Sequence, residues 1–373
     1  MIIDKLSEEN LDKQQSRKII KKAGDILKKG GLVAFPTETV YGLGADALNP
    51  EAAKKIYSAK GRPSDNPLIV HIADFADIEK IVEEVPDSAR TLADKFWPGP
   101  LTMILKKSAA VPDTTSGGLN TVAIRMPSNK IALELIKASG GYIAAPSANT
   151  SGKPSPTMAE HVASDLDGRI DMLIDGGEVG IGLESTIVDL TVDRPVILRP
   201  GAITQQMLSD AIGEVLIDEA LIKADSTVRP KAPGMKYKHY APKAQITIVE
   251  GNKESVVKYI NEEISKKLQE MYEQEEGSGK NIFDNPLALD IIEGRIGILC
   301  SEETKNLYPY GYAKSVGHYN NEEEIARNLY AVLRDFDKTS VEIIYSESFY
   351  TPNMGHAIMN RLLKAAGHHR IQL

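Results

Sequence analysis

The chain has 373 residues, 42% of them hydrophobic; this length is typical of two domains, and this composition can fill a core. Its formal net charge of −8 excludes a protein that coats nucleic acid non-specifically, so tight RNA binding would need a local basic patch. The single cysteine, Cys300, excludes an intramolecular disulfide and fits a reducing compartment. The N-terminus lacks a signal-peptide pattern and no apolar run is long enough to span a bilayer, so we expect a cytoplasmic protein without a membrane partner.

The first predicted elements surround a polar stretch. Apolar residues at helical spacing predict a helix over residues 16–29, and a buried strand, 32–35, follows it. A segment rich in hydroxyls and glycine comes next. Asn49 then provides the N-cap, and Pro50 and Glu51 the first turn, of a helix expected to end near residue 59. The apolar strand 68–70 leads to His71.

Strands and helices go on alternating to residue 212, which favours an α/β layer fold with ligand-binding groups at strand ends. The close spacing of elements between Asp175 and Arg199 suggests hairpins, so we expect a mixed sheet. The expected strands are 101–105, 122–124, 142–145, 172–174, 185–190 and 196–198, and the expected helices lie near 77–85, 86–96, 128–139, 158–165 and 204–212.

The composition changes at residues 229–243, which are rich in proline, lysine and aromatic side chains. This pattern predicts an extended linker, either a plain spacer or a segment that touches a ligand. A second α/β unit of Rossmann-like or flavodoxin-like character begins at Gln245. We therefore expect one domain over 1–228, the linker over 229–243 and a smaller domain over 244–373.

Most short catalytic motifs are missing. There is no GxxxxGK[ST] phosphate loop, and the absence of HExxH, CxxC and GxSxG gives zinc-hydrolase and serine-esterase chemistry little support. Residues 42–47 fit the loose dinucleotide-binding pattern GxGxx[GA]. This pattern requires a strand directly before it and a helix directly after it, but no strand immediately precedes these residues and the next helix starts too late, so the match carries little weight.

Five cations stand near glycine, proline, serine or threonine at the ends of expected elements: Lys60, Arg62, Arg125, Lys153 and Arg199. Each alone is compatible with an ordinary surface charge or with a member of an ion pair. Clustered without carboxylates, such cations would repel one another by ~1 kcal/mol or more per close pair, so together they predict a polyanion such as a triphosphate. Neutral donors for phosphate oxygens and polar substrates would come from Thr37, Ser147, Ser155 and Ser185.

Several segments together resemble one known family, the YrdC-like threonylcarbamoyl-AMP synthases. The resemblance covers residues 15–212 and includes the family's KxR…SxN signature, as Lys60-x-Arg62 and Ser147-x-Asn149. The linker and the second α/β unit resemble the two-domain form of the enzyme. The segments that carry the resemblance are PTETVYGLGADA, KGRPSDNPLIVHI, FWPGPLT, VAIRMP, APSANTSGKPSPT, ESTIVDL, LRPGAIT and PGMKYKHYAP.

The resemblance implies an open twisted mixed sheet of the YrdC-like kind, followed by a smaller Rossmann-like α/β domain. It implies a nucleotidyltransferase that converts L-threonine, bicarbonate (or CO2) and ATP, with Mg2+ on the triphosphate, into L-threonylcarbamoyl-AMP and pyrophosphate. A separate tRNA threonylcarbamoyl-transferase complex would use the product to modify adenosine 37 of tRNAs that read ANN codons. Contact between this chain and tRNA would then be indirect.

The resemblance also implies residue roles. Lys60 and Arg62 would be catalytic, as electrostatic stabilisers of the phosphates. L-threonine would be bound by Arg125 and Ser185, in a pocket lined by Thr37, Tyr41 and His71. ATP would be bound by Lys60, Arg62, Asn66, Thr121, Ser147, Asn149, Ser155 and Arg199, with Tyr240 of the linker reaching over it as part of a lid. Mg2+ would have few protein ligands.

Two other functions are weighed against this one. An RNA-binding or ribosome-binding protein would use the basic concave face of the same sheet, although the acidic net charge disfavours it. A carbamoyltransferase that acts on another acceptor is disfavoured too, because its relatives carry zinc fingers that a chain with one cysteine cannot form.

Overall fold

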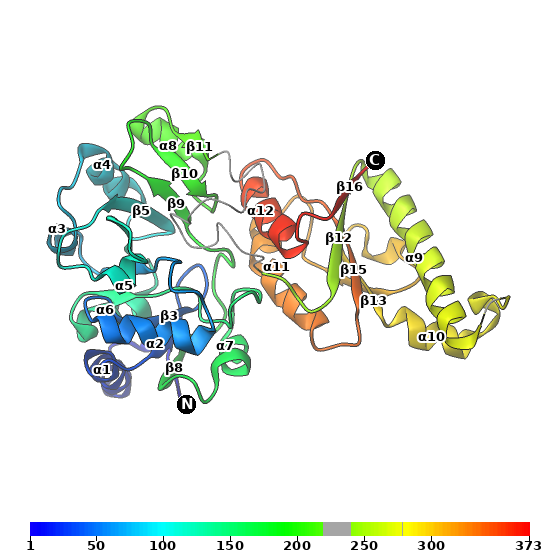
Figure 1. Ribbon diagram of the computed structural model, residues 1–373, viewed down its shortest axis with the longest axis horizontal. Coiled ribbons are helices and arrows are strands. Elements are labelled where there is room, and N and C mark those ends of the chain that lie inside the picture. The colour runs from blue at the N-terminus through cyan, green and yellow to red at the C-terminus, as the bar shows by residue number, and fades with distance from the viewer. Residues whose placement is uncertain (219–239, 278) are drawn as a thin grey trace. The chain divides into compact units, whose positions relative to one another are not determined.

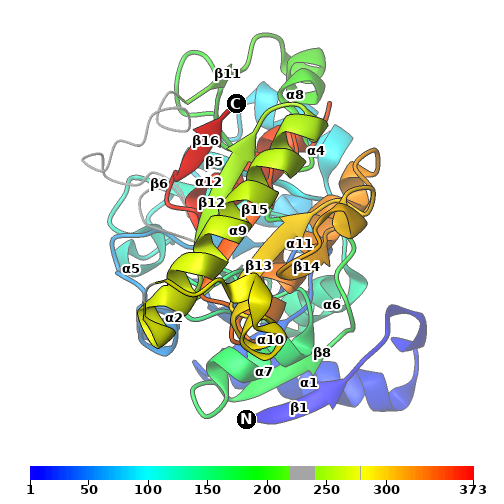
Figure 2. The same cartoon turned by 90° about the vertical axis from the view of Figure 1, so that its right-hand side faces the viewer.

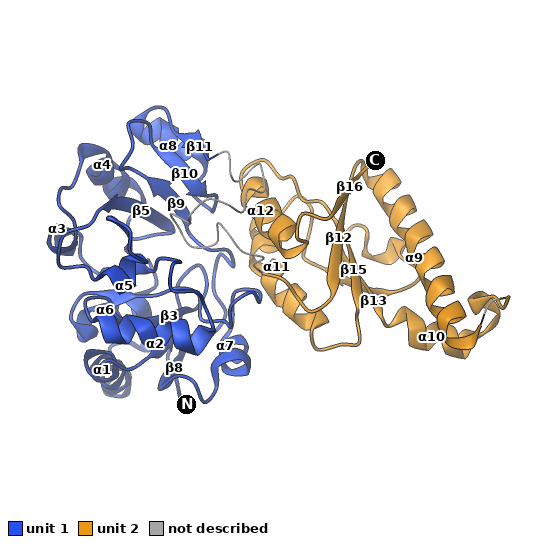
Figure 3. Ribbon diagram, viewed as in Figure 1, with its two compact units in different colours: residues 1–237 blue, residues 238–373 orange. Residues whose placement is uncertain are grey.

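The structure, a computed structural model, describes residues 1–218, 240–277 and 279–373. The chain divides into two compact units, residues 1–237 and 238–373 (Figure 3). Most of the predicted linker, 229–243, lies outside the described residues.

The described part of the first unit is built on a mixed sheet of eleven strands, in the order β1-β8-β2-β3-β7-β4-β6-β5-β9-β10-β11. Figure 1 labels some of these strands, among them β3, β5 and β9. Its middle strands are β3 (Gly42–Asp46), β7 (Ile143–Ala144), β4 (Ile69–His71), β6 (Thr121–Arg125), β5 (Leu101–Lys106) and β9 (Thr186–Asp189). Its outer strands are β1 (Ile2–Lys5), β8 (Met172–Asp175), β2 (Val33–Phe35), β10 (Val196–Arg199) and β11 (Leu216–Ile217). β4 runs parallel to β6, and β9 pairs with β10 as the expected antiparallel hairpin.

Helices cover both faces of this sheet, since its strands carry apolar side chains on both. On β2, Val33 packs with α1 (Gln14–Lys28) and α6 (Lys130–Ser139), whereas Ala34 packs with α2 (Pro50–Lys60). α1 and α6 approach closely at Gly24, where an added Cβ would lie 2.7–2.9 Å from atoms of Ala138, so a larger residue would push the helices apart. The other helices of this unit are α3 (Ile78–Ile81), α4 (Asp87–Phe96), α5 (Asp113–Ser116), α7 (Ala159–Leu166) and α8 (Gln205–Ile212), with 3-10 turns at Glu8–Asn10 and Phe75–Asp77.

The described part of the second unit contains an all-parallel sheet of five strands in the order β14-β13-β15-β12-β16 (Figure 2). These strands are β12 (Gln245–Glu250), β13 (Ile296–Cys300), β14 (Tyr312–Ser315), β15 (Ile343–Glu347) and β16 (Arg370–Gln372). α9 (Lys253–Glu276) covers one face, and α11 (Glu322–Phe336) and α12 (Gly355–Ala365) cover the other (Figure 1). α10 (Pro286–Glu293) and 3-10 turns at Ile282–Asp284 and Lys305–Leu307 complete the unit. Nowhere in the described ranges is a helix both long and apolar enough to cross a membrane.

The expected fold class is confirmed: an open mixed α/β sheet is followed by a smaller parallel α/β sheet. The main difference concerns Gly42–Asp46, expected as loop and found as the strand β3, antiparallel to β2. Added Cβ atoms at Gly42 and Gly44 would lie 3.3 Å and 2.8 Å from neighbouring side chains, so the two glycines serve close packing inside the sheet. The loose dinucleotide pattern is therefore part of a strand and not a phosphate loop.

Candidate functional site

Polar side chains from three neighbouring strands form one row across the first sheet. His71 at the end of β4 pairs with Arg125 at the end of β6, and Arg125 pairs with Thr102 of β5. Paired residues of adjacent strands point to the same face. All three are buried, Arg125 with 4% exposure. A guanidinium this deep requires polar or charged partners.

The loop between β2 and β3 supplies those partners. Nη1 of Arg125 donates a 2.9 Å hydrogen bond to Oγ1 of Thr39, and Nη2 lies 2.7 Å from Oε1 of Glu38. Oγ1 of Thr39 lies 2.9 Å from Oγ1 of Thr37, which donates to the Val40 carbonyl. The expectation that the cations cluster without carboxylates is therefore wrong for Arg125, because burial of this charge brings a counter-charge with it.

Ser185 connects this row to a second arginine. Its hydroxyl lies 2.7 Å from Oγ1 of Thr102 and accepts a 3.1 Å hydrogen bond from Nη2 of Arg199, whose Nε donates to the Ser185 carbonyl. Both Thr102 and Arg199 pair with Ile187 of β9, so the row continues across β5, β9 and β10. Arg125 and Arg199 thus lie at the same end of the sheet.

Three loops meet beside this row. Backbone N–H groups of the loop before β9 donate to the carbonyls of Glu38 and Thr39, over 2.8 and 3.0 Å. The buried hydroxyl of Ser155, in the loop after β7, donates to Oε1 of Glu184, the residue before Ser185. The β2–β3 loop, the loop after β7 and the loop before β9 are therefore joined by direct hydrogen bonds.

The C-terminus of α2 presents the two predicted catalytic cations. Asn49 caps the helix as expected, since its side chain accepts from the N–H groups of residues 51 and 52, and Pro50 occupies the first turn. Gly61 ends the helix with φ of 64°, a left-handed conformation that favours glycine. This turn separates Lys60, the last helical residue, from Arg62.

Lys60 contacts the other half of the KxR…SxN signature directly. Its Nζ donates to the backbone carbonyls of Ser147 and Asn149, and the Ser147 hydroxyl donates to Oδ1 of Asn149 over 2.5 Å. Nη2 of Arg62 donates to the carbonyl of Asn66 over 3.2 Å and to that of the following proline over 2.9 Å. The structure therefore brings three of the four signature residues into contact, with Arg62 two residues beyond the helix end.

The predicted site residues fall at two ends of β4 and β6. Arg62 contacts carbonyls just before β4, and Thr121 begins the parallel β6, whereas His71 and Arg125 end these two strands. At roughly 3.3 Å per residue, about 13 Å separates the two ends of β6. Most residues predicted for ATP lie at the first end, and those predicted for threonine at the second. Arg199 and Ser155, both predicted for ATP, lie at the threonine end.

Two buried groups of the predicted threonine pocket have shifted pKa values. Burial, and next the charge of Arg125, lowers the pKa of His71 to about 3, so its imidazole is neutral at pH 7. Burial also raises the pKa of Tyr41 well above its usual value. The Tyr41 hydroxyl donates to the Gly177 carbonyl over 2.6 Å and accepts from the Gly176 N–H over 3.0 Å. This tyrosine is therefore held by the backbone after β8.

Comparison with known proteins finds a family match for each of the two units, and the two matches agree with each other. Residues 25–201 match the family described as Telomere recombination, and residues 203–367 match the family described as Threonylcarbamoyl-AMP synthase, C-terminal domain. The threonylcarbamoyl-AMP synthase of Bacillus subtilis (strain 168) is 49% identical over 349 residues, which is 93% of each chain. The chain belongs to the threonylcarbamoyl-AMP synthase family. It has the family's two-domain form.

Two further matches cover at least 95% of this family member. The threonylcarbamoyl-AMP synthase of Pyrococcus abyssi is 47% identical over 354 residues, 95% of this chain and 96% of that protein. The crystal structure of P. abyssi Sua5 complexed with L-threonine matches with a TM-score of 0.87 and 45% identity, over 100% of both chains. The family predicted from the motifs is confirmed.

Some polar residues at the site of this family member were not predicted from the sequence. Glu38, Thr39, Thr102 and Glu184 each contact a predicted residue, yet only the structure places them there. The sequence pattern indicated these contacts only weakly. Glu38, for example, stands between two threonines, a pattern equally typical of an exposed turn. Lys153 forms a 2.9 Å ion pair with the buried Asp165, as the ion-pair alternative allowed, so the expectation of a cluster without carboxylates is wrong for this residue as well.

Tyr240, predicted to reach over ATP, lies in the second unit. It is 5% exposed, and its ring stacks on that of Tyr330 with centroids 5.2 Å apart. The guanidinium carbon of Arg361 lies 5.8 Å from the same ring. Its contact with ATP stays a prediction.

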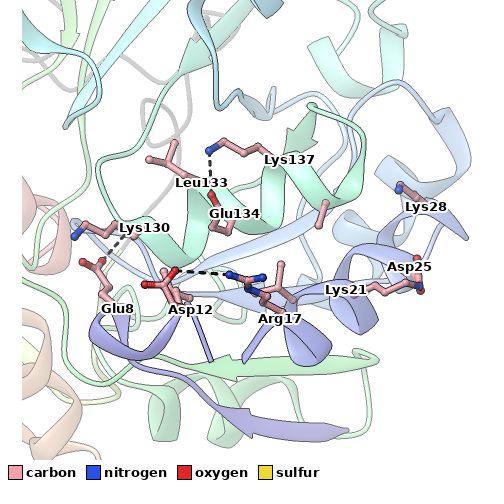
Figure 4. A pocket seen from close by; sticks show the side chains of 13 residues that line it. Glu8, Asp12, Arg17, Lys21, Asp25, Lys28, Lys130, Leu133, Glu134 and Lys137 are labelled. Carbon is pink, nitrogen blue, oxygen red and sulfur yellow. Dashed lines mark hydrogen bonds and ion pairs between the residues drawn. The ribbon is translucent and has the colours of Figure 1, made fainter. Parts of the chain in front are cut away.

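A hollow of about 920 Å3 between α1 and α6 contains none of the predicted site residues (Figure 4). Charges of both signs line it, and they pair with one another: Lys137 with Glu134 at 3.0 Å and Arg17 with Asp12 at 4.0 Å. Surface pairs of this kind contribute little stability. They also cancel the positive field that a triphosphate would need.

No cluster of three histidine, cysteine, aspartate or glutamate side chains suited to a metal ion is found in the described ranges. Two carboxylates at the candidate site, those of Glu38 and Glu184, already contact Arg125 and Ser155. Mg2+ prefers to keep several waters and to bind through substrate phosphates with one or two carboxylates. This donor set therefore fits an ion that arrives with ATP better than a resident one.

Proposed function

We propose that the chain condenses L-threonine, bicarbonate or CO2, and ATP into L-threonylcarbamoyl-AMP and pyrophosphate. The observation that carries this proposal is the buried row in which Arg125 and Arg199 are connected through Thr102 and Ser185. Two guanidinium groups at one end of a sheet, flanked by hydroxyls, suit a substrate with a carboxylate beside a second anion. Full-length relatives with this activity support it.

On the amino-acid side, Arg125 binds the threonine carboxylate, which an arginine fork holds with two hydrogen bonds. Ser185 orients the same group. Thr37, Tyr41 and His71 line the pocket, and the neutral imidazole of His71 favours a polar uncharged partner such as the threonine hydroxyl.

On the nucleotide side, the triphosphate lies along the residues at the first end of β4 and β6. The threonine ammonium group releases two protons to solvent as its nitrogen bonds to CO2, which gives a carbamate with one remaining N–H. An oxygen of this carbamate then attacks the α-phosphorus while the bond to pyrophosphate breaks. Lys60 and Arg62 stabilise the charge that develops on the phosphate oxygens, and Mg2+ bound to ATP adds to this stabilisation. The remaining ATP ligands are Asn66, Thr121, Ser147, Asn149, Ser155, Arg199 and Tyr240.

The product is a mixed anhydride that water can hydrolyse, so it needs protection until it is used. A linker carrying Tyr240 provides this protection as a lid. A separate tRNA threonylcarbamoyl-transferase complex consumes the product in the cytoplasm, and tRNA makes no direct contact with this chain.

The proposal is tested by measuring pyrophosphate release from ATP with the full chain. Release is expected only when L-threonine and bicarbonate are both present. Release that is independent of threonine would contradict the proposal.

A further inference from the structure

Glu38 is a buried carboxylate that the reaction proposed above does not use. Its side chain is 14% exposed and lies 2.7 Å from Nη2 of Arg125. Thr37 and Thr39, its neighbours in sequence, are linked by a hydrogen bond, and Thr39 accepts from the same guanidinium. Glu38 and its neighbours therefore surround the group that is proposed to hold the threonine carboxylate.

The backbone that carries this carboxylate is held by the loop before β9. The Glu38 carbonyl accepts a 2.8 Å hydrogen bond from the N–H of Ile181, and the Thr39 carbonyl accepts one from Gly182. The loop before β9 thus holds the β2–β3 loop through two backbone hydrogen bonds. The backbone of Glu38 therefore starts the side chain from a fixed place, from which its carboxylate reaches Arg125.

A second carboxylate at Arg125 creates an electrostatic problem. The threonine carboxylate would place two negative charges beside one guanidinium, in a buried region where like charges repel strongly. The problem disappears when the ligand brings a positive charge next to its own carboxylate. In an α-amino acid bound between the two residues, charges alternate in sign from Arg125 through the substrate carboxylate and ammonium to Glu38.

We propose that Glu38 binds the ammonium group of the amino-acid substrate, and that it makes the pocket selective for zwitterions over carboxylic acids without an amine. This inference rests on the proposed function and names the residue that sets its substrate class. Formation of the carbamate removes the positive charge and adds a negative one. The attraction to Glu38 is then replaced by repulsion, which favours movement of the carbamate towards the α-phosphate of ATP.

The test measures ligand binding to the full chain by calorimetry. The two ligands are L-threonine and the matching 2,3-dihydroxybutyrate, in which a hydroxyl replaces the ammonium group. The variant is Glu38→Gln, which keeps the shape and removes the charge. Glu51→Gln is the matched control, because Glu51 is an exposed carboxylate on α2 paired only with Lys54 in its own helix.

The wild-type chain and Glu51→Gln are expected to bind L-threonine at least ~100-fold more tightly than the hydroxy acid, the scale of a buried charge pair. Glu38→Gln is expected to bind threonine at least ~10-fold more weakly and to lose most of this preference. A merely structural role would weaken both ligands alike and leave their ratio unchanged.

Three results would overturn the inference: an unchanged ratio in Glu38→Gln, tighter threonine binding in that variant, or equal affinities for the two ligands in the wild type. Tighter binding would mean that Glu38 only competes with the substrate for Arg125. If Glu38→Gln does not fold, Glu38→Asp takes its place and is expected to keep part of the preference. A wild-type chain that binds no threonine would instead contradict the proposed function.

Discussion

The hydroxyl of Ser185 lies 3.1 Å from Nη2 of Arg199 and also 2.7 Å from Oγ1 of Thr102, the strand partner of Arg125. Ser185 has no measurable exposure, and Arg199 has 5%. One buried hydroxyl, itself proposed to orient the threonine carboxylate, therefore also contacts an arginine proposed for ATP. Loss of this hydroxyl is expected to weaken the binding of both L-threonine and ATP.

Ser185→Ala is predicted to raise KM for L-threonine and for ATP by about tenfold each, since a hydrogen bond to a charged group contributes about 1.5–3 kcal/mol. Steady-state pyrophosphate release at varied concentrations of each substrate measures this. Thr204→Ala, which removes the hydroxyl that caps α8, is the control for a general loss of stability. A change in only one of the two KM values would mean that Ser185 takes no part in binding the other substrate.

Arg62→Ala is predicted to lower the rate of threonine-dependent pyrophosphate release at least ~100-fold, the scale expected for the loss of one preorganised charged donor. Arg17→Ala provides the matched control, because the Arg17 side chain is 73% exposed on α1. A near-normal rate in Arg62→Ala would remove this arginine from the site.

Much of this arrangement could be predicted from the sequence. The cap at Asn49, the proline after it and the glycine after Lys60 fix α2 locally, so its ends follow from a few adjacent residues. The strand β3 could not be predicted, because its glycines are chosen for close packing against β2 and β7 rather than for strand propensity. Local rules identify local features and miss those that depend on distant partners.

The same distinction applies to the candidate site. The family signature located Lys60, Arg62, Ser147 and Asn149, because these residues are recognisable by type and spacing. The ion pairs of Arg125 with Glu38 and of Lys153 with Asp165 join residues 87 and 12 positions apart, and no spacing indicates them. The sequence therefore identified the cations and missed the carboxylates that balance two of them.

His71 predicts a dependence of stability on pH. Its pKa is about 3 in the folded chain and 6.5 in the unfolded one, so below pH 6.5 the unfolded state binds a proton that the folded state does not. The contribution of neutral His71 to the free energy of unfolding is fully present above pH 6.5. It falls by about 1.4 kcal/mol per pH unit towards pH 3. Between pH 6.5 and pH 5 this residue is expected to contribute a loss of about 2 kcal/mol.

Denaturant unfolding of the first unit at several pH values measures this loss. His71→Gln cannot take up the proton and is expected to show a shallower pH dependence, by the same amount, whatever its stability at pH 7. Parallel pH profiles for the variant and the wild type would contradict the neutral, buried state of His71.

Tyr240 offers a test of the predicted lid. Tyr240→Ala is expected to lower the yield of the adenylate more than it lowers the affinity for ATP, because a lid excludes water without holding the nucleotide alone. Tyr240→Phe keeps the ring that stacks on Tyr330 and separates this effect from a loss of packing in the second unit. Equal losses of yield and affinity in Tyr240→Ala would favour simple ligand binding.

The most direct test of the central claim is mass spectrometry of the reaction of the full chain with ATP, L-threonine and carbon-13 bicarbonate. We predict a product with the mass of L-threonylcarbamoyl-AMP that contains one labelled carbon, together with pyrophosphate. Unlabelled threonyl-AMP as the product, or AMP formed without any threonine adduct, would contradict the account.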